Sequence, residues 1–181
     1  MNDRQAMAAD APQDAATGID LDILVEAGAW GDIDGLARRA IGATLEEIGR
    51  TGAASELSLV LTDDAHIRAL NAAWRGKDKA TNVLSFPAAA VTPDKPLPPM
   101  LGDIVVAFET VAREAELEAK PFAHHLTHLI VHGFLHLIGH DHEDECDAEA
   151  METIERRALA RLAIDDPYAV DEEQAYQPKW R

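Results

Sequence analysis

One stretch constrains this chain more than any other: residues 132–142, which read HGFLHLIGHDH. His132 and His136 are four residues apart in an otherwise apolar run of helical character. Both imidazoles therefore lie on one face of a helix, about one turn apart. Gly139 can adopt the left-handed conformation that ends a helix and lets the chain turn back. The stretch predicts a helix that presents two imidazoles, with further metal ligands in the turn after it.

Spacing alone does not identify the pair, because five histidines repeat every four residues: His124, His128, His132, His136 and His140. Residues eight apart on a straight helix are separated by about 12 Å along its axis. Zinc ligands lie about 2 Å from the metal, so three of these histidines cannot converge without a break in the helix. The obvious break is Gly139. We expect the two histidines nearest to it, His132 and His136, and one beyond it to bind zinc. His142 is preferred to His140 because five intervening residues give the chain room to reverse.

Three imidazole ligands leave a tetrahedral zinc with one open position, which is the arrangement of a catalytic site. We therefore predict one Zn²⁺ per chain, although imidazoles also suit nickel, copper and iron. In peptidases of the H-E-x-x-H type, a glutamate general base follows the first histidine, but here that residue is Gly133. Asp141 is a candidate for the base. It is also a candidate for a carboxylate that orients a ligand imidazole, and both interpretations stay open.

The stretch HGFLHLIGHDH resembles the signature HGxLHLxGxDH of the YbeY family, which comprises bacterial endoribonucleases and rRNA maturation factors. Residues 70–87, LNAAWRGKDKATNVLSFP, are similar to the arginine-containing block of the same family. Residues 101–108, LGDIVVAF, are similar to its glycine–aspartate strand, and residues 164–168, IDDPY, also fit. The resemblance thus covers the chain between about residues 20 and 168, in the order of the family.

The resemblance implies a zinc-dependent single-strand endoribonuclease that acts in maturation of the 3′ end of 16S rRNA and in ribosome quality control. It implies single-stranded rRNA precursor, not DNA, as the substrate, and the small ribosomal subunit and its assembly proteins as partners. It also points to Arg75 as a functional residue. A guanidinium binds phosphate in a two-pronged way and opposes the charge that develops during cleavage. Arg75 and Asp141 are therefore the catalytic candidates.

Two other functions stay open. The first is a metal-dependent hydrolase of peptides or small molecules, although Gly133 in place of a glutamate counts against it. The second is a non-catalytic assembly factor in which zinc is structural and the acidic surface binds ribosomal proteins.

The formal net charge of −17 contrasts with an RNA substrate, because binding of nucleic acids normally relies on lysine and arginine. A local basic group precedes the strand that we expect at residues 82–86: Arg68, Arg75, Lys77 and Lys79. Such a group can attract phosphate within an acidic molecule, since charges beyond a Debye length are screened. We therefore expect weak, salt-sensitive RNA binding unless a larger partner holds the RNA.

The order of the predicted elements indicates an α+β domain, with one small four-stranded mixed sheet and helices packed on it. We expect strands at residues 19–25, 55–62, 82–86 and 103–108. We expect helices from Asp34 to Gly49 or Gly52, from Asp63 or Asp64 to Trp74, and over residues 109–120, 122–138 and 146–163. The proline-rich residues 88–99 predict a loop beside the site. The resemblance implies a zincin-like arrangement, with the zinc site on a central buried helix.

A length of 181 residues suits one domain. We place this domain at residues 18–168, between a disordered N-terminal tail, residues 1–17, and an acidic C-terminal tail, residues 169–181. The chain has one cysteine, Cys146, and no run of about 20 apolar residues. Its start lacks the pattern of a secretory signal. These features predict a cytoplasmic protein without a membrane partner.

Overall fold

The computed structural model describes residues 17–51, 54–93, 95–141 and 145–169. The strands are β1 (Ile19–Val25), β2 (Ser55–Thr62), β3 (Val83–Pro87) and β4 (Met100–Ala107). The helices are α2 (Asp34–Glu47), α3 (Asp64–Arg75), α4 (Phe108–Leu117), α5 (Phe122–Leu137) and α6 (Glu145–Arg161). The two predicted tails lie almost entirely outside the described residues. No helix in the described ranges has both the length and the apolar composition needed to cross a membrane.

The strands form one sheet in the order β1-β2-β4-β3. β1, β2 and β4 are parallel, whereas β3 is antiparallel to β4 and lies at the edge. The predicted α+β class with a four-stranded mixed sheet is therefore confirmed. β4 begins three residues earlier than predicted, because Met100 already pairs with Glu56 of β2. α4 ends at Leu117, before the predicted Lys120, because Ala119 adopts a positive φ of 52° that turns the chain towards α5.

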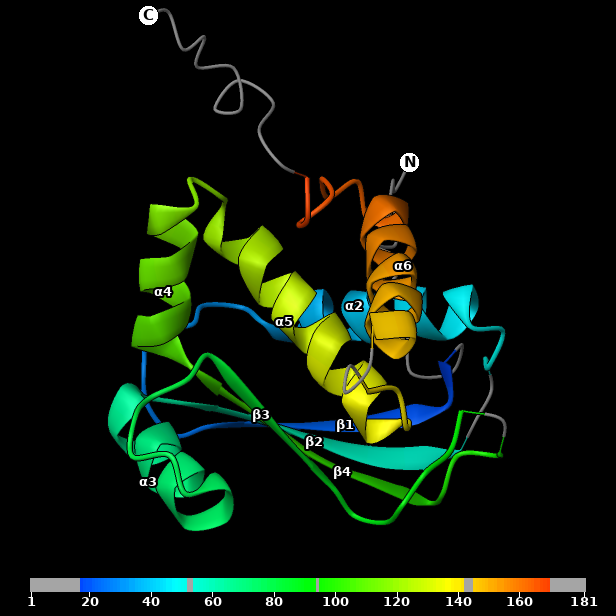
Figure 1. Ribbon diagram of the computed structural model, residues 1–181, viewed down its shortest axis with the longest axis horizontal. Helices are drawn as coiled ribbons and strands as arrows, with labels where there is room; N and C mark the ends of the chain where they lie inside the picture. Colours follow the sequence, from blue (N-terminus) through cyan, green and yellow to red (C-terminus); the bar gives the residue numbers. More distant parts are fainter. Residues whose placement is uncertain (1–16, 52–53, 94, 142–144, 170–181) are drawn as a thin grey trace, which may run out of the picture.

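The two faces of the sheet are covered unequally. Figure 1 shows α2, α4, α5 and α6 on one face, where the large core lies, and α3 on the other. In β4, Ile104 and Val106 point into the large core. Val105, between them, packs against Ile67 of α3 in a second, smaller cluster. The alternation of side chains along a strand produces this division, and it leaves β4 buried on both faces.

Gly133 lets α5 lie very close to the sheet. A Cβ atom at this position would lie 3.0 Å from Cγ2 of Ile104 and 3.1 Å from Oγ of Ser85. The Ser85 hydroxyl also donates a hydrogen bond of 3.0 Å to the Gly133 carbonyl oxygen. The contact fixes α5 against β3 and β4 one residue after His132. The glycine that interrupts the peptidase pattern is thus a packing residue, and a glutamate side chain has no room there.

The end of α5 follows the sequence prediction. Gly139 has a φ of 94°, in the left-handed region. A Cβ atom there would lie 2.3 Å from the carbonyl oxygen of Val91. The turn after α5 is therefore packed against the loop between β3 and β4, and both the backbone angle and the space require glycine.

Candidate active site

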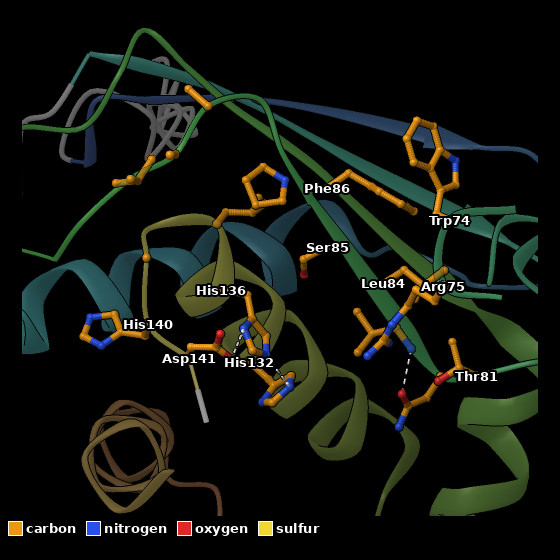
Figure 2. A pocket seen from close by; sticks show the side chains of 18 residues that line it. Trp74, Arg75, Thr81, Leu84, Ser85, Phe86, His132, His136, His140 and Asp141 are labelled. Atoms are coloured by element: carbon orange, nitrogen blue, oxygen red, sulfur yellow. Dashed lines mark hydrogen bonds and ion pairs between the residues drawn. The ribbon is translucent and has the colours of Figure 1, made fainter. Parts of the chain in front are cut away.

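Two imidazoles converge at the C-terminal end of α5. The Nε2 atoms of His132 and His136 are 3.1 Å apart, and Figure 2 shows both rings at the wall of a cleft. Both side chains are partly exposed. The helical spacing predicted one face and one turn for this pair. The structure places them in this way and also points the same ring nitrogen of each towards the other.

A buried carboxylate stands behind His132. The Nδ1–H of His132 donates a hydrogen bond of 2.8 Å to Oε1 of Glu155, in α6. The other oxygen, Oε2, accepts hydrogen bonds from Nε2 of His128, at 2.9 Å, and from the Tyr168 hydroxyl. Only 1% of the Glu155 side chain is exposed. Glu155 therefore holds the proton of His132 at Nδ1 and leaves its Nε2 lone pair facing His136 and the cleft.

The hydrogen bonds keep Glu155 ionised despite its burial. Burial alone would raise the pKa of this carboxyl, but the hydrogen bonds from His128, His132 and Tyr168 outweigh burial and lower the pKa to about 2. The pKa of the Tyr168 hydroxyl is raised by burial and then by the Glu155 carboxylate. Tyr168 therefore stays a hydrogen-bond donor, and Glu155 stays a charged acceptor at neutral pH.

This arrangement fits a metal ion with imidazole ligands. Two nitrogens at 2.0–2.1 Å from a tetrahedral zinc are about 3.4 Å apart, and the observed separation is 3.1 Å. A metal-binding histidine usually donates its other ring N–H to a carboxylate, which fixes the tautomer and makes the ligand more basic. His132 and Glu155 have this relationship. Two of the three predicted ligands are therefore in a geometry that suits a metal.

The residues after α5 are placed as follows. The Oδ1 atom of Asp141 lies 4.0 Å from Nδ1 of His136, beyond direct hydrogen-bond distance, and Figure 2 shows the side chain directed towards the pair. The His140 ring points away from the pair in the same view. Burial lowers the pKa of His140, and the positive charge of Arg50 adds to this effect.

His142, the predicted third ligand, lies outside the described residues. Among those that are described, no three histidine, cysteine, aspartate or glutamate side chains are gathered closely enough to hold a metal ion.

The cleft beside the imidazoles has a volume of about 750 Å³. Its walls come from the end of α3, from β3 and the loop after it, and from the end of α5. Arg75, the predicted catalytic arginine, is the last residue of α3 and lines this cleft. Figure 2 shows Arg75 across Ser85 from the histidine pair. Its guanidinium makes no ion pair within the described part of the chain, so its charge is available to a ligand.

The predicted basic group is smaller than the sequence indicated. Arg68 donates hydrogen bonds of 2.7 and 3.0 Å to the carboxylate of Asp78. This partner raises the pKa of Arg68 and lowers that of Asp78. The Arg68 charge is therefore compensated locally, and the predicted group reduces to Arg75, Lys77 and Lys79. Arg75 is the member that lines the cleft.

Glu155, His128 and Tyr168 were not predicted as parts of this site. A signal for Glu155 was present in the sequence, because it lies four residues after Met151 and three before Ala158. Both of these apolar residues belong to the inner face of α6, and a lone carboxylate on such a face needs a buried partner. The partner of Glu155 comes from another helix, which spacing within α6 does not reveal.

Fold and site together define a class: an α+β protein with a carboxylate-supported pair of imidazoles at the wall of a cleft that also contains an arginine. The family model described as Endoribonuclease YbeY matches residues 29–163. A protein named Endoribonuclease YbeY from Rhizobium meliloti (strain 1021) is 54% identical over 161 residues, which cover 84% of this chain and 96% of the relative. One of the same name from Rhodopseudomonas palustris (strain BisA53) is 52% identical over 164 residues, 87% of this chain and 94% of the relative.

The chain therefore belongs to the endoribonuclease YbeY family. The resemblance stated from the sequence motifs is confirmed. A solved structure, TM1509 from Thermotoga maritima, has a TM-score of 0.53 and is 24% identical. The match covers 90% of this chain and 100% of that one, and it supports the fold alone.

Proposed function

We propose that this protein is a zinc-dependent endoribonuclease that cleaves single-stranded rRNA precursor. Within this proposal it acts in the cytoplasm, in maturation of the 3′ end of 16S rRNA and in ribosome quality control. The small ribosomal subunit and its assembly proteins are its partners, and the domain is zincin-like. The family supports the RNA substrate. The observation that carries the metal dependence is the 3.1 Å separation of two imidazole nitrogens beside the cleft that Arg75 lines.

In this proposal His132, His136 and His142 hold the metal. Glu155 fixes the tautomer and orientation of His132 through its hydrogen bond to Nδ1. Asp141 lies on the corresponding side of His136, 4.0 Å from its Nδ1. That position favours an orienting role for Asp141 over that of general base. When bound, zinc supplies a Lewis acid that polarises a phosphoryl oxygen and lowers the barrier to attack on phosphorus.

Arg75 supplies the second positive charge. Its guanidinium would bind the phosphate oxygens that gain charge in the transition state, in the two-pronged geometry that a lysine cannot reproduce. RNA carries its own nucleophile, the 2′-hydroxyl beside each phosphate, so the cleft needs no strong protein base. Gly133, which provides no base, is compatible with this chemistry. We therefore expect a DNA strand of the same sequence to stay intact.

The test combines metal analysis with cleavage of a single-stranded rRNA precursor, on protein purified without a histidine tag. We expect about one zinc per chain. Arg75→Ala should abolish cleavage while zinc content stays unchanged, and Arg75→Lys should restore little. Lys77→Ala is the matched control. It also removes one positive charge, two residues after Arg75, but the Lys77 side chain does not line the cleft. An unchanged cleavage rate for Arg75→Ala would contradict the proposal.

A non-catalytic assembly factor is the second candidate. The net charge of −17 favours it, because an acidic protein attracts basic ribosomal proteins. His136→Ala distinguishes the two. A folded His136→Ala protein that still supports assembly of the small subunit would favour the second candidate, whereas loss of rRNA maturation supports the first.

A further inference from the structure

An aromatic side chain at the end of α3 is not used by the hydrophobic core. The Trp74 side chain is 73% exposed, whereas Trp30 is 6% exposed. Trp30 packs against Phe108 and Phe122, with ring centroids 5.2 and 6.1 Å away. Trp74 also lines the cleft that contains Arg75 and the histidine pair. The chain thus places its most exposed described indole at the site, where a ligand can cover it.

The ring of Trp74 contacts Phe86, and the residue is otherwise largely exposed. Trp74 lies seven residues after Ile67, at the end of the apolar stripe of α3 that packs on the sheet. Beyond this stripe its ring meets Phe86 of the edge strand β3, edge-on, with centroids 5.9 Å apart and planes at 62°. Figure 2 shows the two rings side by side, on the same side of the cleft as Arg75. An indole held in this way offers a flat apolar surface beside a guanidinium.

We propose that Trp74, backed by Phe86, is a stacking platform for an unpaired base of single-stranded RNA, and that Arg75 binds a phosphate next to that base. The inference rests on the proposed function and adds to it a binding subsite. Sequence-specific and general single-strand binders hold splayed bases on aromatic side chains. Every base has a flat face, so the platform tolerates any sequence.

Stacking on Trp74 matters more for RNA affinity because the molecule is acidic. With a net charge of −17, the chain offers few cations to phosphates. The basic group near the cleft is reduced further by the Arg68–Asp78 pair. Stacking does not depend on released counterions, so it adds affinity that salt does not remove. Trp74 and Arg75, consecutive in the chain, thus combine a salt-independent and a salt-dependent contact.

The experiment measures binding of single-stranded 2′-O-methyl RNA to the zinc-loaded protein by fluorescence anisotropy. This RNA keeps bases and phosphates and blocks the 2′-hydroxyl. We expect Trp74→Ala to weaken binding by roughly 5- to 150-fold, the range of one stacked base. Trp74→Phe should retain most of the affinity. Leu117→Ala is the control, because Leu117 is 79% exposed and lies outside the cleft.

The salt dependence separates the two neighbours. Trp74→Ala should leave the slope of log K against log salt concentration unchanged, whereas Arg75→Ala should reduce it by about 1. A series of RNAs with one abasic nucleotide at successive positions then locates the base. At that position the abasic RNA should bind the wild type as weakly as the complete RNA binds Trp74→Ala. It should weaken binding to Trp74→Ala no further, because the two changes remove one interaction.

The outcomes distinguish this inference from the proposed function. A wild-type protein that neither binds nor cleaves RNA overturns both. A wild-type protein that cleaves RNA while Trp74→Ala binds and cleaves equally well overturns the platform alone. Abasic and Trp74→Ala effects that simply add also overturn it. If Trp74→Ala is defective only with ribosomal particles and binds free RNA normally, Trp74 does not stack on single-stranded RNA and the platform is wrong.

Discussion

Each half of α5 carries a pair of histidines, three residues apart in the first half and four apart in the second, yet the two pairs use their ring nitrogens in opposite ways. In the first half, Nε2 of His128 donates to Glu155, and Nε2 of His125 lies 2.9 Å from Glu114. In the second half, His132 uses Nδ1 for Glu155, and its Nε2 faces His136. Nε2 thus meets a carboxylate in His125 and His128, whereas in His132 and His136 it meets the neighbouring imidazole at the wall of the cleft.

The difference comes from the elements around α5. Glu155 reaches across from α6 between two turns of α5, with one oxygen for each of two histidines. Glu114 of α4 lies 2.9 Å from Nε2 of His125 and also accepts a hydrogen bond of 3.0 Å from Asn82. The carboxylates from neighbouring helices therefore fix which ring nitrogen of each histidine they contact: Nε2 in His125 and His128, but Nδ1 in His132.

The largest effect that we predict comes from removing a histidine in the second half of α5. His136→Ala should reduce bound zinc from about one per chain to none and abolish RNA cleavage, because it removes one of the three imidazoles that the proposed zinc site needs. His128→Ala should keep zinc, because Nε2 of His128 is hydrogen-bonded to Glu155 in the wild type. Metal analysis after gel filtration, together with circular dichroism to show folding, makes the comparison. A His128→Ala protein as poor in zinc as His136→Ala would remove the distinction between the halves.

The carboxylate between the halves should have the next largest effect. Glu155→Gln keeps the shape of the side chain but removes the charge that holds the proton of His132 at Nδ1. We expect zinc affinity to fall about 10- to 100-fold, as for other carboxylates behind a metal-binding histidine. A competition titration with a chromogenic chelator measures it. The control is Glu114→Gln, whose partner His125 lies in the first half, and its zinc affinity should stay at the wild-type value.

The third prediction is at Gly133, which lets the second half of α5 lie close to the sheet. Gly133→Ala would place a methyl group 3.0 Å from Ile104 and 3.1 Å from Ser85. We expect it to lower the free energy of unfolding by about 1–3 kcal/mol, the usual cost of overpacking. Gly42→Ala in α2 is the matched helical control, since its Cβ would lie 3.4 Å from Thr17, an ordinary contact. Urea denaturation should show Gly42→Ala as neutral or up to about 1 kcal/mol more stable.

Much of this contrast could not be read from the sequence, for a physical reason. Periodicity within one segment predicted the strands, the helices and the pair His132–His136, because these depend on local backbone geometry. The sequence left Asp63 and Asp64 open as the start of the next helix, and the structure selects Asp63 as its cap, because the Asp63 side chain accepts a hydrogen bond of 2.8 Å from the backbone N–H of His66. The partner of a side chain on another element depends on tertiary packing. Glu155, which supports His132 from α6, could not be assigned to it from spacing.

The same limit applies to charge. The sequence placed Arg68 and Arg75 in one basic group, since both lie in the same segment. Asp78 lies ten residues after Arg68, and the turn between α3 and β3 brings them together. Only the fold shows that one arginine is compensated and that the other faces the cleft. Composition gives the net charge of −17 but not which cations face the cleft.

The smallest effect that we predict is at a carboxylate in water, the counterpart of buried Glu155. Asp34 accepts hydrogen bonds from Arg38, which lower its pKa from 3.8. Because the folded pKa is below the unfolded one, this stabilisation is complete above about pH 4 and is lost as the pH falls through the lower folded value. Asp34→Asn should therefore lower the free energy of unfolding at pH 7 by only about 0.3–0.5 kcal/mol. Denaturation of the wild type and of Asp34→Asn at pH 7 and well below pH 4 measures this difference, and the two free energies of unfolding should converge at the acidic pH. A difference that persists in acid would show that Asp34 stabilises α2 by something other than its charge.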